Sequence, residues 1–279
     1  MKPMHRLLIA AAAAVAVVGP TVAWAAGYYK TPEEYTWSFE GPFGTYDRAQ
    51  LQRGFHVYQM VCSTCHGLEH LSFRHMGMAG GPFDEVQLPG EDYPTDFSSD
   101  PNENPVIRAI AAEYIIEDGP NEFGDMFERA GRPSDGFPYP FENEQQGRAA
   151  NGGAYPPDLS VIVKARKGGP EYIRSLLLGY DYEVPEDYDV RPGTYYNPYF
   201  PGGILAMPPI LFEDGVEYAD GTPATVEQQA ADITAFLAWA AEPHMEARKR
   251  MGLAVMLYLL FLCGLLYAAY RTLWARVKH

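Results

Sequence analysis

Two cysteines and a histidine stand close together in the run Cys62-Ser63-Thr64-Cys65-His66. This C-x-x-C-H spacing is typical of covalent haem attachment, because both sulfurs meet one edge of the porphyrin and the adjacent histidine reaches the iron. A redox dithiol would need a βαβ context, whereas the sequence predicts a helix directly before Cys62. A zinc site would need two further ligands at short spacing. The motif therefore predicts one covalently bound c-type haem.

The residues alone do not decide which side chain binds the iron opposite His66. A methionine would raise the reduction potential, a histidine would lower it, and an empty position would allow ligand chemistry. Met207 is favoured because Pro208 and Pro209 follow it and stiffen the loop that must hold the sulfur. The other candidates outside the membrane are Met60, Met76, Met78, Met126, Met245, His56, His70, His75 and His244.

The elements that must position the motif are predicted to be helical. Apolar periodicity and capping residues indicate helices over residues 47–61, 105–116, 171–178 and 225–241. The first begins at the N-cap Asp47 and leads into the motif. The last begins with Thr225 and Gln228, the pattern of a capping box. We expect these two helices to cross, with Gly54 allowing close approach to Phe236 or Leu237.

Long polar segments separate the predicted helices. The chain contains 27 Gly and 24 Pro, and 47% of its residues are hydrophobic, so a loop-rich body with a sizeable core is expected. Residues 84–128 are strongly acidic, and residues 131–158 and 180–223 are rich in glycine and proline. Loops this long are usually functional, and a large flat cofactor would give them something to surround.

The two ends of the chain indicate export and anchoring. Residues 1–25 have a basic start, a short apolar core and small residues before Ala26, which predicts a cleaved signal peptide. Residues 251–270 carry no charge and are long enough for one transmembrane helix. We therefore expect an extracytoplasmic domain over 26–247, and an anchor with a short cytoplasmic tail over 248–279.

Composition narrows the class of partner. The formal net charge is −15 and the sequence pI is about 4.8, which excludes nucleic acid as a partner because binding it needs basic patches. An acidic surface favours basic proteins, mainly through their rate of association. The three cysteines exclude a disulfide scaffold.

Several motifs occur together in a fixed order. They are C-S-T-C-H-G-L (62–68), R-A-A-N-G-G-A-Y-P-P-D-L-S (148–160), Y-Y-N-P-Y-F-P-G-G-I-L-A-M-P-P (195–209), D-G-T-P-A-T-V (220–226), W-A-A-E-P (239–243) and R-K-R-M-G-L (248–253). From about residue 37 to residue 274 the chain resembles the cytochrome c1 family, the haem subunits of quinol–cytochrome c reductase (cytochrome bc1) complexes. Tyr155 and the acidic stretch 84–105 depart from the pattern that the resemblance leads us to expect.

The resemblance implies a mainly α fold: a class I-like cytochrome c domain with long loop insertions plus one C-terminal transmembrane helix. It also implies haem c as cofactor, with thioether bonds to Cys62 and Cys65. The other site residues that it implies are the axial ligands His66 and Met207, Arg148 near a propionate, Phe200 and Leu205 along the ring, and Pro138 and Pro140 in a covering loop.

The resemblance further implies an electron carrier rather than an enzyme in its own right. Electrons would arrive from the Rieske iron–sulfur subunit and leave to a soluble cytochrome c, within a dimeric complex that contains cytochrome b. With the predicted signal peptide, we expect a bacterial inner membrane, a periplasmic haem domain and a cytoplasmic C-terminus. The alternatives are a free-standing membrane-anchored carrier and an enzyme with an open haem.

Overall fold

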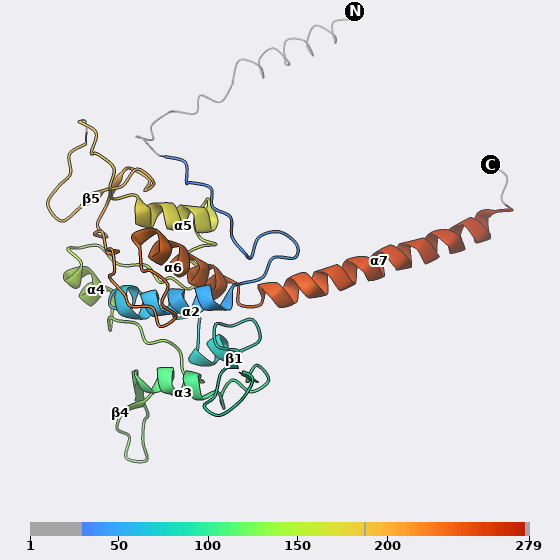
Figure 1. Ribbon diagram of the computed structural model, residues 1–279, viewed down its shortest axis with the longest axis horizontal. Helices are drawn as coiled ribbons and strands as arrows, with labels where there is room; N and C mark the ends of the chain where they lie inside the picture. The colour runs from blue at the N-terminus through green and yellow to red at the C-terminus, as the bar shows by residue number, and fades with distance from the viewer. Residues whose placement is uncertain (1–29, 187, 277–279) are drawn as a thin grey trace, which may run out of the picture.

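The computed structural model describes residues 30–186 and 188–276. The predicted signal peptide, residues 1–25, lies outside the described residues. Within the described part, a mostly helical body carries small two-stranded sheets, and one long helix leaves it (Figure 1). The prediction of a mainly α domain with one C-terminal apolar helix is confirmed.

The elements agree closely with the helices expected from the sequence. The helical segments are α2 (Arg48–Val57), a π-helical turn (Tyr58–Cys62), a 3₁₀ turn (Phe73–Gly77), α3 (Pro105–Ala112), α4 (Glu144–Ala150), α5 (Gly169–Leu178), α6 (Val226–Ala241) and α7 (Met245–Trp274). The antiparallel strand pairs are β1 (Glu85–Val86) with β2 (Thr95–Asp96), β3 (Ile115–Asp118) with β4 (Phe127–Ala130), and β5 (Tyr195–Tyr196) with β6 (Ile204–Leu205).

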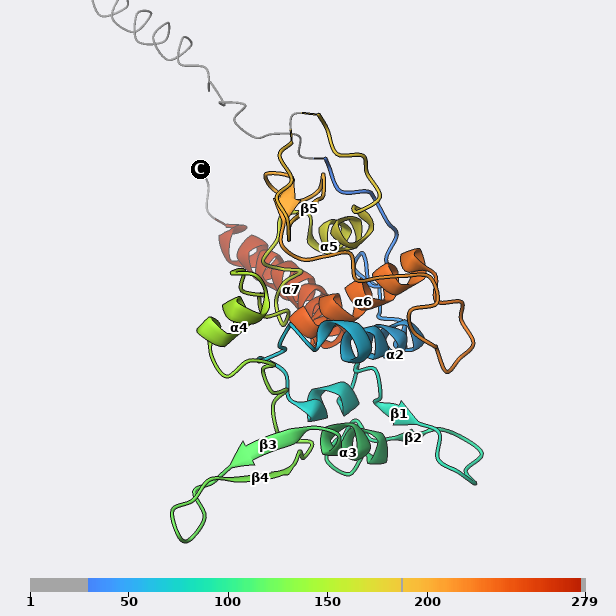
Figure 2. The ribbon, with the colours of Figure 1, turned by 90° about the vertical axis from the view of Figure 1, so that its left-hand side faces the viewer.

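The centre of the body is the crossing of α2 and α6, with α5 packed on one side and α3 with its neighbouring hairpins on the other (Figure 2). Gly54 makes the crossing possible. A Cβ atom at Gly54 would lie 2.1 Å from the backbone oxygen of Asp232 and 2.7 Å from Cβ of Phe236. The predicted close approach at Phe236 is confirmed, and the backbone of Asp232 comes closer still.

An ion pair lies within the same crossing. The carboxylate of Asp232 is fully buried, and Arg53 donates to it from Nε at 2.9 Å. Gln228 donates to Asp232 from Nε2 at 2.9 Å. The capping box predicted at α6 is therefore only half formed: Thr225 Oγ1 accepts from the backbone N–H of Gln228 at 3.1 Å, but the Gln228 side chain bonds forward instead. The buried carboxylate competes more strongly for this amide than the helix end does.

The acidic segment 84–128 departs from the loop that we expected. It folds into the β1–β2 and β3–β4 hairpins, with α3 between them. The predicted helix 105–116 ends at Ala112, and Ile115 enters β3 opposite Ala130. Arg129 secures this hairpin through contacts with Asp118 and Asp135. Which residues form such strands depends on their pairing with residues farther along the chain, so the periodicity within one segment could not predict them.

The C-terminal helix is longer than the apolar run within it. Helix α7 spans Met245–Trp274, its most apolar stretch has a mean hydropathy of 2.2, and none of that stretch is buried. An exposed helix of this length and composition is a membrane span. The chain is therefore membrane-anchored, as predicted. The helix begins six residues before position 251 because its first turns pack on the body, where Met245 is buried.

Candidate functional site

The C-x-x-C-H motif lies where α2 changes its winding. The chain widens into a π-helical turn over Tyr58–Cys62, and such turns occur often at functional sites. The next residues close a tight turn, because His66 donates its backbone N–H to the carbonyl of Cys62 at 2.9 Å. Tyr58 donates its hydroxyl to the carbonyl of His66 at 3.0 Å. The motif is therefore fixed to the helix that precedes it.

The two cysteines of the motif differ in burial. Cys62 is buried, and burial raises the pKa of its thiol to about 12. A redox-active C-x-x-C pair needs a lowered thiol pKa instead, so this environment does not suit a dithiol oxidoreductase. Within residues 30–186 and 188–276, no group of three or more His, Cys, Asp and Glu side chains is placed to hold a metal ion.

His66 is oriented by a backbone carbonyl. Its Nδ1 lies 2.7 Å from the carbonyl oxygen of Pro157, and because that oxygen can only accept, Nδ1 carries the proton. The lone pair therefore remains on Nε2, the arrangement of a metal-binding imidazole. Burial lowers the pKa of His66, which favours the neutral ring.

The motif opens onto a cavity of about 400 Å³. Its walls come from the motif, from residues 151–166, from α5 and α6, and from the segment that follows β6. Most lining side chains are apolar, among them Tyr155, Leu176, Ile210 and Leu237. An apolar cavity with a few polar groups at its edge is the usual form of a cofactor site.

Met207 lines the same cavity as Cys62, Cys65 and His66. The β5–β6 pairing of Tyr195 with Leu205 holds the chain just before it. The half-buried Tyr180 donates its hydroxyl to the backbone carbonyl of Met207 at 2.9 Å. The loop that carries the thioether is therefore held from two directions.

The remaining predicted site residues divide into two groups. Phe200 and Leu205 line the cavity. Among the described residues, the lining does not include Arg148, Pro138 or Pro140. Arg148 is exposed on α4, where its Nε donates to Glu144 at 2.8 Å and its Nη1 donates to the carbonyl of Gly153 at 3.0 Å.

The cavity is instead lined by an arginine that sequence reasoning missed, and this residue is exposed. Among the described lining residues, Arg166 is the one arginine, and no lysine lines the cavity. Its only local signal is its place in the basic run 164–167, which follows the apolar residues 161–163. Such a run is equally typical of a solvated surface. Only the tertiary structure shows that Arg166, and not the lysines of the run, lines the cavity.

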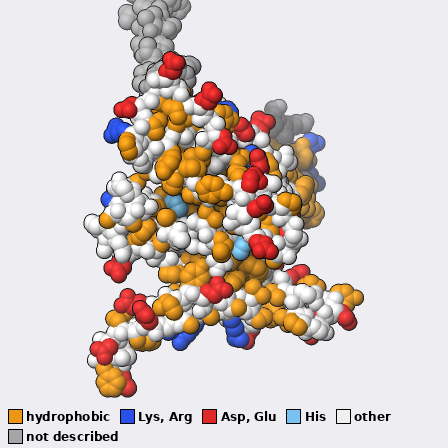
Figure 3. Space-filling view, turned by 60° about the vertical axis from the view of Figure 1, so that its left-hand side comes forward, with side chains coloured by type: hydrophobic (Ala, Val, Ile, Leu, Met, Phe, Trp, Pro, Cys, Tyr) orange, Lys and Arg blue, Asp and Glu red, His pale blue; other side chains and the backbone are white. Residues whose placement is uncertain are grey.

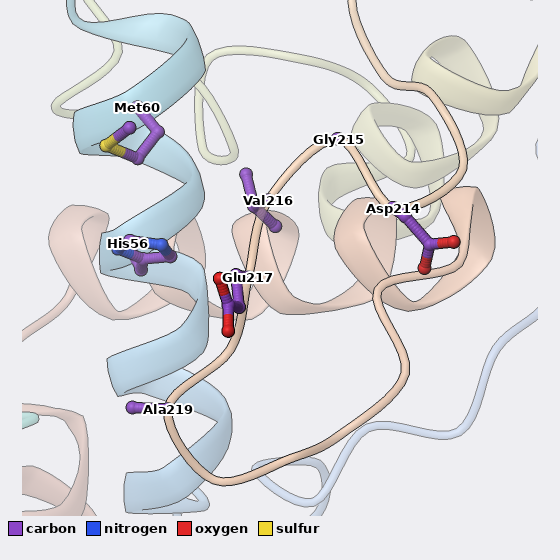
Figure 4. Close-up of a pocket in the computed structure, with 7 residues that line it drawn as sticks. All are labelled: His56, Met60, Asp214, Gly215, Val216, Glu217 and Ala219. Carbon is purple, nitrogen blue, oxygen red and sulfur yellow. The ribbon is translucent and has the colours of Figure 1, made fainter.

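The structure also places the alternative axial ligands. Of the described methionines and histidines, only Met207 and His66 line the cavity. Met76 is fully buried in the core. His56 and Met60 lie on the helix that leads to Cys62 but face a separate surface pocket beside Glu217 (Figure 4).

Comparison with known proteins agrees with this arrangement. The model of the Cytochrome C1 family matches residues 37–277. The chain is 41% identical to "Cytochrome c1" of Rhodospirillum rubrum, over 99% of this chain and 98% of that protein. It is 46% identical to "Cytochrome c1 1, heme protein, mitochondrial" of Arabidopsis thaliana, over 88% of this chain and 73% of that protein.

A further relative is a longer protein. The chain is 46% identical to "Cytochrome b/c1" of Bradyrhizobium diazoefficiens over 88% of its own length, but it spans only 36% of that relative. The family match covers nearly all of the body and the membrane helix, and it includes every wall of the cavity. The chain belongs to the cytochrome c1 family, the electron-carrier subunits of the cytochrome bc1 complex.

Proposed function

We propose that this chain binds one haem c covalently through Cys62 and Cys65, and that it carries electrons from the Rieske iron–sulfur subunit to a soluble cytochrome c. The observation that supports this most strongly is that His66 and Met207 line one cavity with both cysteines. A neutral imidazole and a thioether are the axial ligands of high-potential c-type cytochromes.

The cavity fits a haem in its chemistry. The two thiols belong to one turn, the lining is largely apolar, and Arg166 would supply a positive charge for a propionate. When bound, haem supplies reversible one-electron chemistry at its iron. The hydrogen bond that His66 donates to the Pro157 carbonyl, and the one that Tyr180 donates to the Met207 carbonyl, would keep each ligand in one place. Little therefore reorganises when an electron passes.

The surface supports a basic electron acceptor. On the face shown in Figure 3, hydrophobic side chains gather in the middle of the body and acidic side chains lie around them. Complementary charge accelerates the encounter of proteins, and salt screens it. An apolar centre with an acidic surround therefore suits brief docking of a positively charged soluble cytochrome c.

The remaining partners are inferred from the family. The Bradyrhizobium relative is named as cytochrome b and c1 in one protein, which supports a position of this chain beside a cytochrome b subunit. We infer a dimeric complex that also contains the Rieske subunit. From the predicted signal peptide and from α7, the candidate membrane span among the described residues, we infer that the haem domain lies on the periplasmic side of a bacterial inner membrane, with the C-terminus in the cytoplasm.

Carbon monoxide binding to the reduced full-length protein tests the ligand assignment. We expect no binding by the wild type, binding by Met207→Ala, and no binding by Met126→Ala, a control at an exposed methionine outside the cavity. Ready binding by the wild type would favour the open-haem enzyme.

Purification in mild detergent tests the assembly, because a chain that migrates without cytochrome b and Rieske partners would favour a free-standing carrier.

A further inference from the structure

A large aromatic side chain is exposed on a turn close to the membrane helix. Phe43 is 77% exposed. The aromatic rings on either side of the turn are packed, since the ring centroid of Phe39 lies 5.0 Å from that of Tyr46 and 5.4 Å from that of Trp37. Phe43 is therefore the ring of this cluster that the body leaves uncovered.

The turn that presents Phe43 is closely built. Thr45 donates its backbone N–H to the carbonyl of Ser38 at 3.1 Å, which closes the turn. A Cβ atom at Gly44 would lie 2.0 Å from the carbonyl oxygen of Glu40, so only glycine fits there. Gly41 has φ +68°, a conformation that glycine adopts without strain. The exposure of Phe43 is therefore a consequence of the turn's geometry.

The first turns of α7 hold this turn in place (Figure 1). Lys249 donates from Nζ to the carbonyl of Phe39 at 2.6 Å and to that of Gly44 at 3.1 Å. One turn earlier, Glu246 accepts the backbone N–H of Tyr46 at 2.8 Å. The membrane helix and the residues on both sides of Phe43 therefore form one rigid unit.

The same contacts set the height of the turn above the membrane. Lys249 lies two residues before position 251, where the uncharged run begins, and two helical residues rise only about 3 Å. The carbonyls that Lys249 contacts must then lie near the membrane–water boundary. Arg248 and Arg250 flank this position and are exposed. Trp and Tyr rings and basic side chains favour this interface, and a phenylalanine ring enters it as an apolar group.

We propose that Phe43 inserts into the lipid interface on the side of the haem domain, next to the point where α7 enters the bilayer, and that Arg250 binds anionic headgroups beside it, whereas Arg248 pairs with Glu242. A second contact with lipid would prevent the body from tilting about α7. The height of the haem cavity above the membrane would then be constant.

A photocrosslinking amino acid distinguishes lipid from protein as the neighbour of Phe43. Benzoylphenylalanine replaces Phe43 in the full chain, within the assembled complex, in membranes that contain phosphatidylglycerol. The matched control is the same replacement at Phe123, a ring of similar exposure (81%) on the β3–β4 hairpin. A replacement at Leu257, exposed within α7, serves as the positive control for lipid. The haem spectrum confirms that each variant is folded.

We expect position 43 to form phospholipid adducts, seen as a mass increase of the intact chain, at a yield near that of position 257 and several-fold above that of position 123. A crosslink to another subunit would instead show that a protein covers Phe43. Adducts at position 257 without any at position 43 would show that the ring faces water. Either of these two results would overturn the proposal.

Discussion

Arg48 and Glu246 form a two-pronged ion pair between α2 and the first turn of α7. Arg48 Nη1 lies 2.9 Å from Oε1 of Glu246, and Nη2 lies 2.9 Å from Oε2. Because α2 leads directly into Cys62, this pair connects the membrane anchor to the segment that carries the candidate haem site. Two parallel bonds of this kind restrict orientation as well as distance.

We expect Glu246→Gln to destabilise the full chain by about 1–2 kcal/mol. This is less than the cost of breaking a fully buried pair, because solvent still reaches Arg48. The thermal midpoint should fall by a few degrees, measured by circular dichroism in detergent. Glu34→Gln, at an exposed position, is the matched control. Equal midpoints for the two variants would show that the pair contributes nothing.

The ion pair between Arg48 and Glu246 should make the free energy of unfolding depend on pH in the acidic range. Burial alone would raise the pKa of Glu246, but its hydrogen bonds with Arg48 outweigh burial and hold the pKa below the ordinary value of 4.5. A lowered pKa gives stability that is present above the ordinary value and is lost as pH falls through the folded value. The difference in thermal midpoint between wild type and Glu246→Gln should therefore shrink below about pH 4.5. A difference that stays constant between pH 7 and pH 3 would contradict this.

Gly54→Ala should damage the crossing of α2 and α6. The added methyl group would meet the backbone oxygen of Asp232 at 2.1 Å, and two packed helices cannot both keep their positions around it. We expect a loss of several kcal/mol, or no folded protein at all. Yield of haem-loaded protein and thermal midpoint measure this. Gly252→Ala, where nothing lies within 4 Å, should behave as wild type. Equal yields would show that the crossing is loose.

Tyr180→Phe should loosen the loop that carries Met207. It removes one hydrogen bond to the Met207 carbonyl, worth about 1 kcal/mol. If Met207 is the axial ligand, the share of reduced protein in which its sulfur is off the iron should rise about fivefold. Carbon monoxide, which should not bind the wild type, should then bind a small fraction of the variant. Tyr195→Phe, on the same hairpin, is the control. No binding by Tyr180→Phe would mean that the β5–β6 pairing alone positions the ligand.

Arg166 and Arg148 can be compared by redox titration. A positive charge beside the iron disfavours the oxidised state, so Arg166→Gln should lower the midpoint potential by about 20–60 mV, up to a tenfold change in the equilibrium constant. Arg148→Gln should leave it unchanged, because Arg148 lies outside the cavity lining. The reverse pattern would support the assignment of Arg148 suggested by the family resemblance.

The sequence by itself determined the features that neighbouring residues encode. The C-x-x-C-H turn, the Asp47 cap of α2 and the uncharged run within α7 each depend on residues a few positions apart. Their hydrogen bonds and burial follow from local spacing, so their boundaries could be predicted to within a few residues. The half-formed box at Thr225 shows the limit, because Asp232, one helical turn beyond Gln228, is buried by the crossing with α2 and redirected that side chain.

Only the tertiary structure decided which distant residues share the cavity. Met207 joins His66 there through strand pairing and the bond from Tyr180. Arg166 lies in the lining and Arg148 does not, although both follow the motif along the chain. The position of Phe43 beside α7 likewise depends on Lys249. Such placements result from how helices and loops pack against each other, and that packing is not contained in the spacing of any one segment.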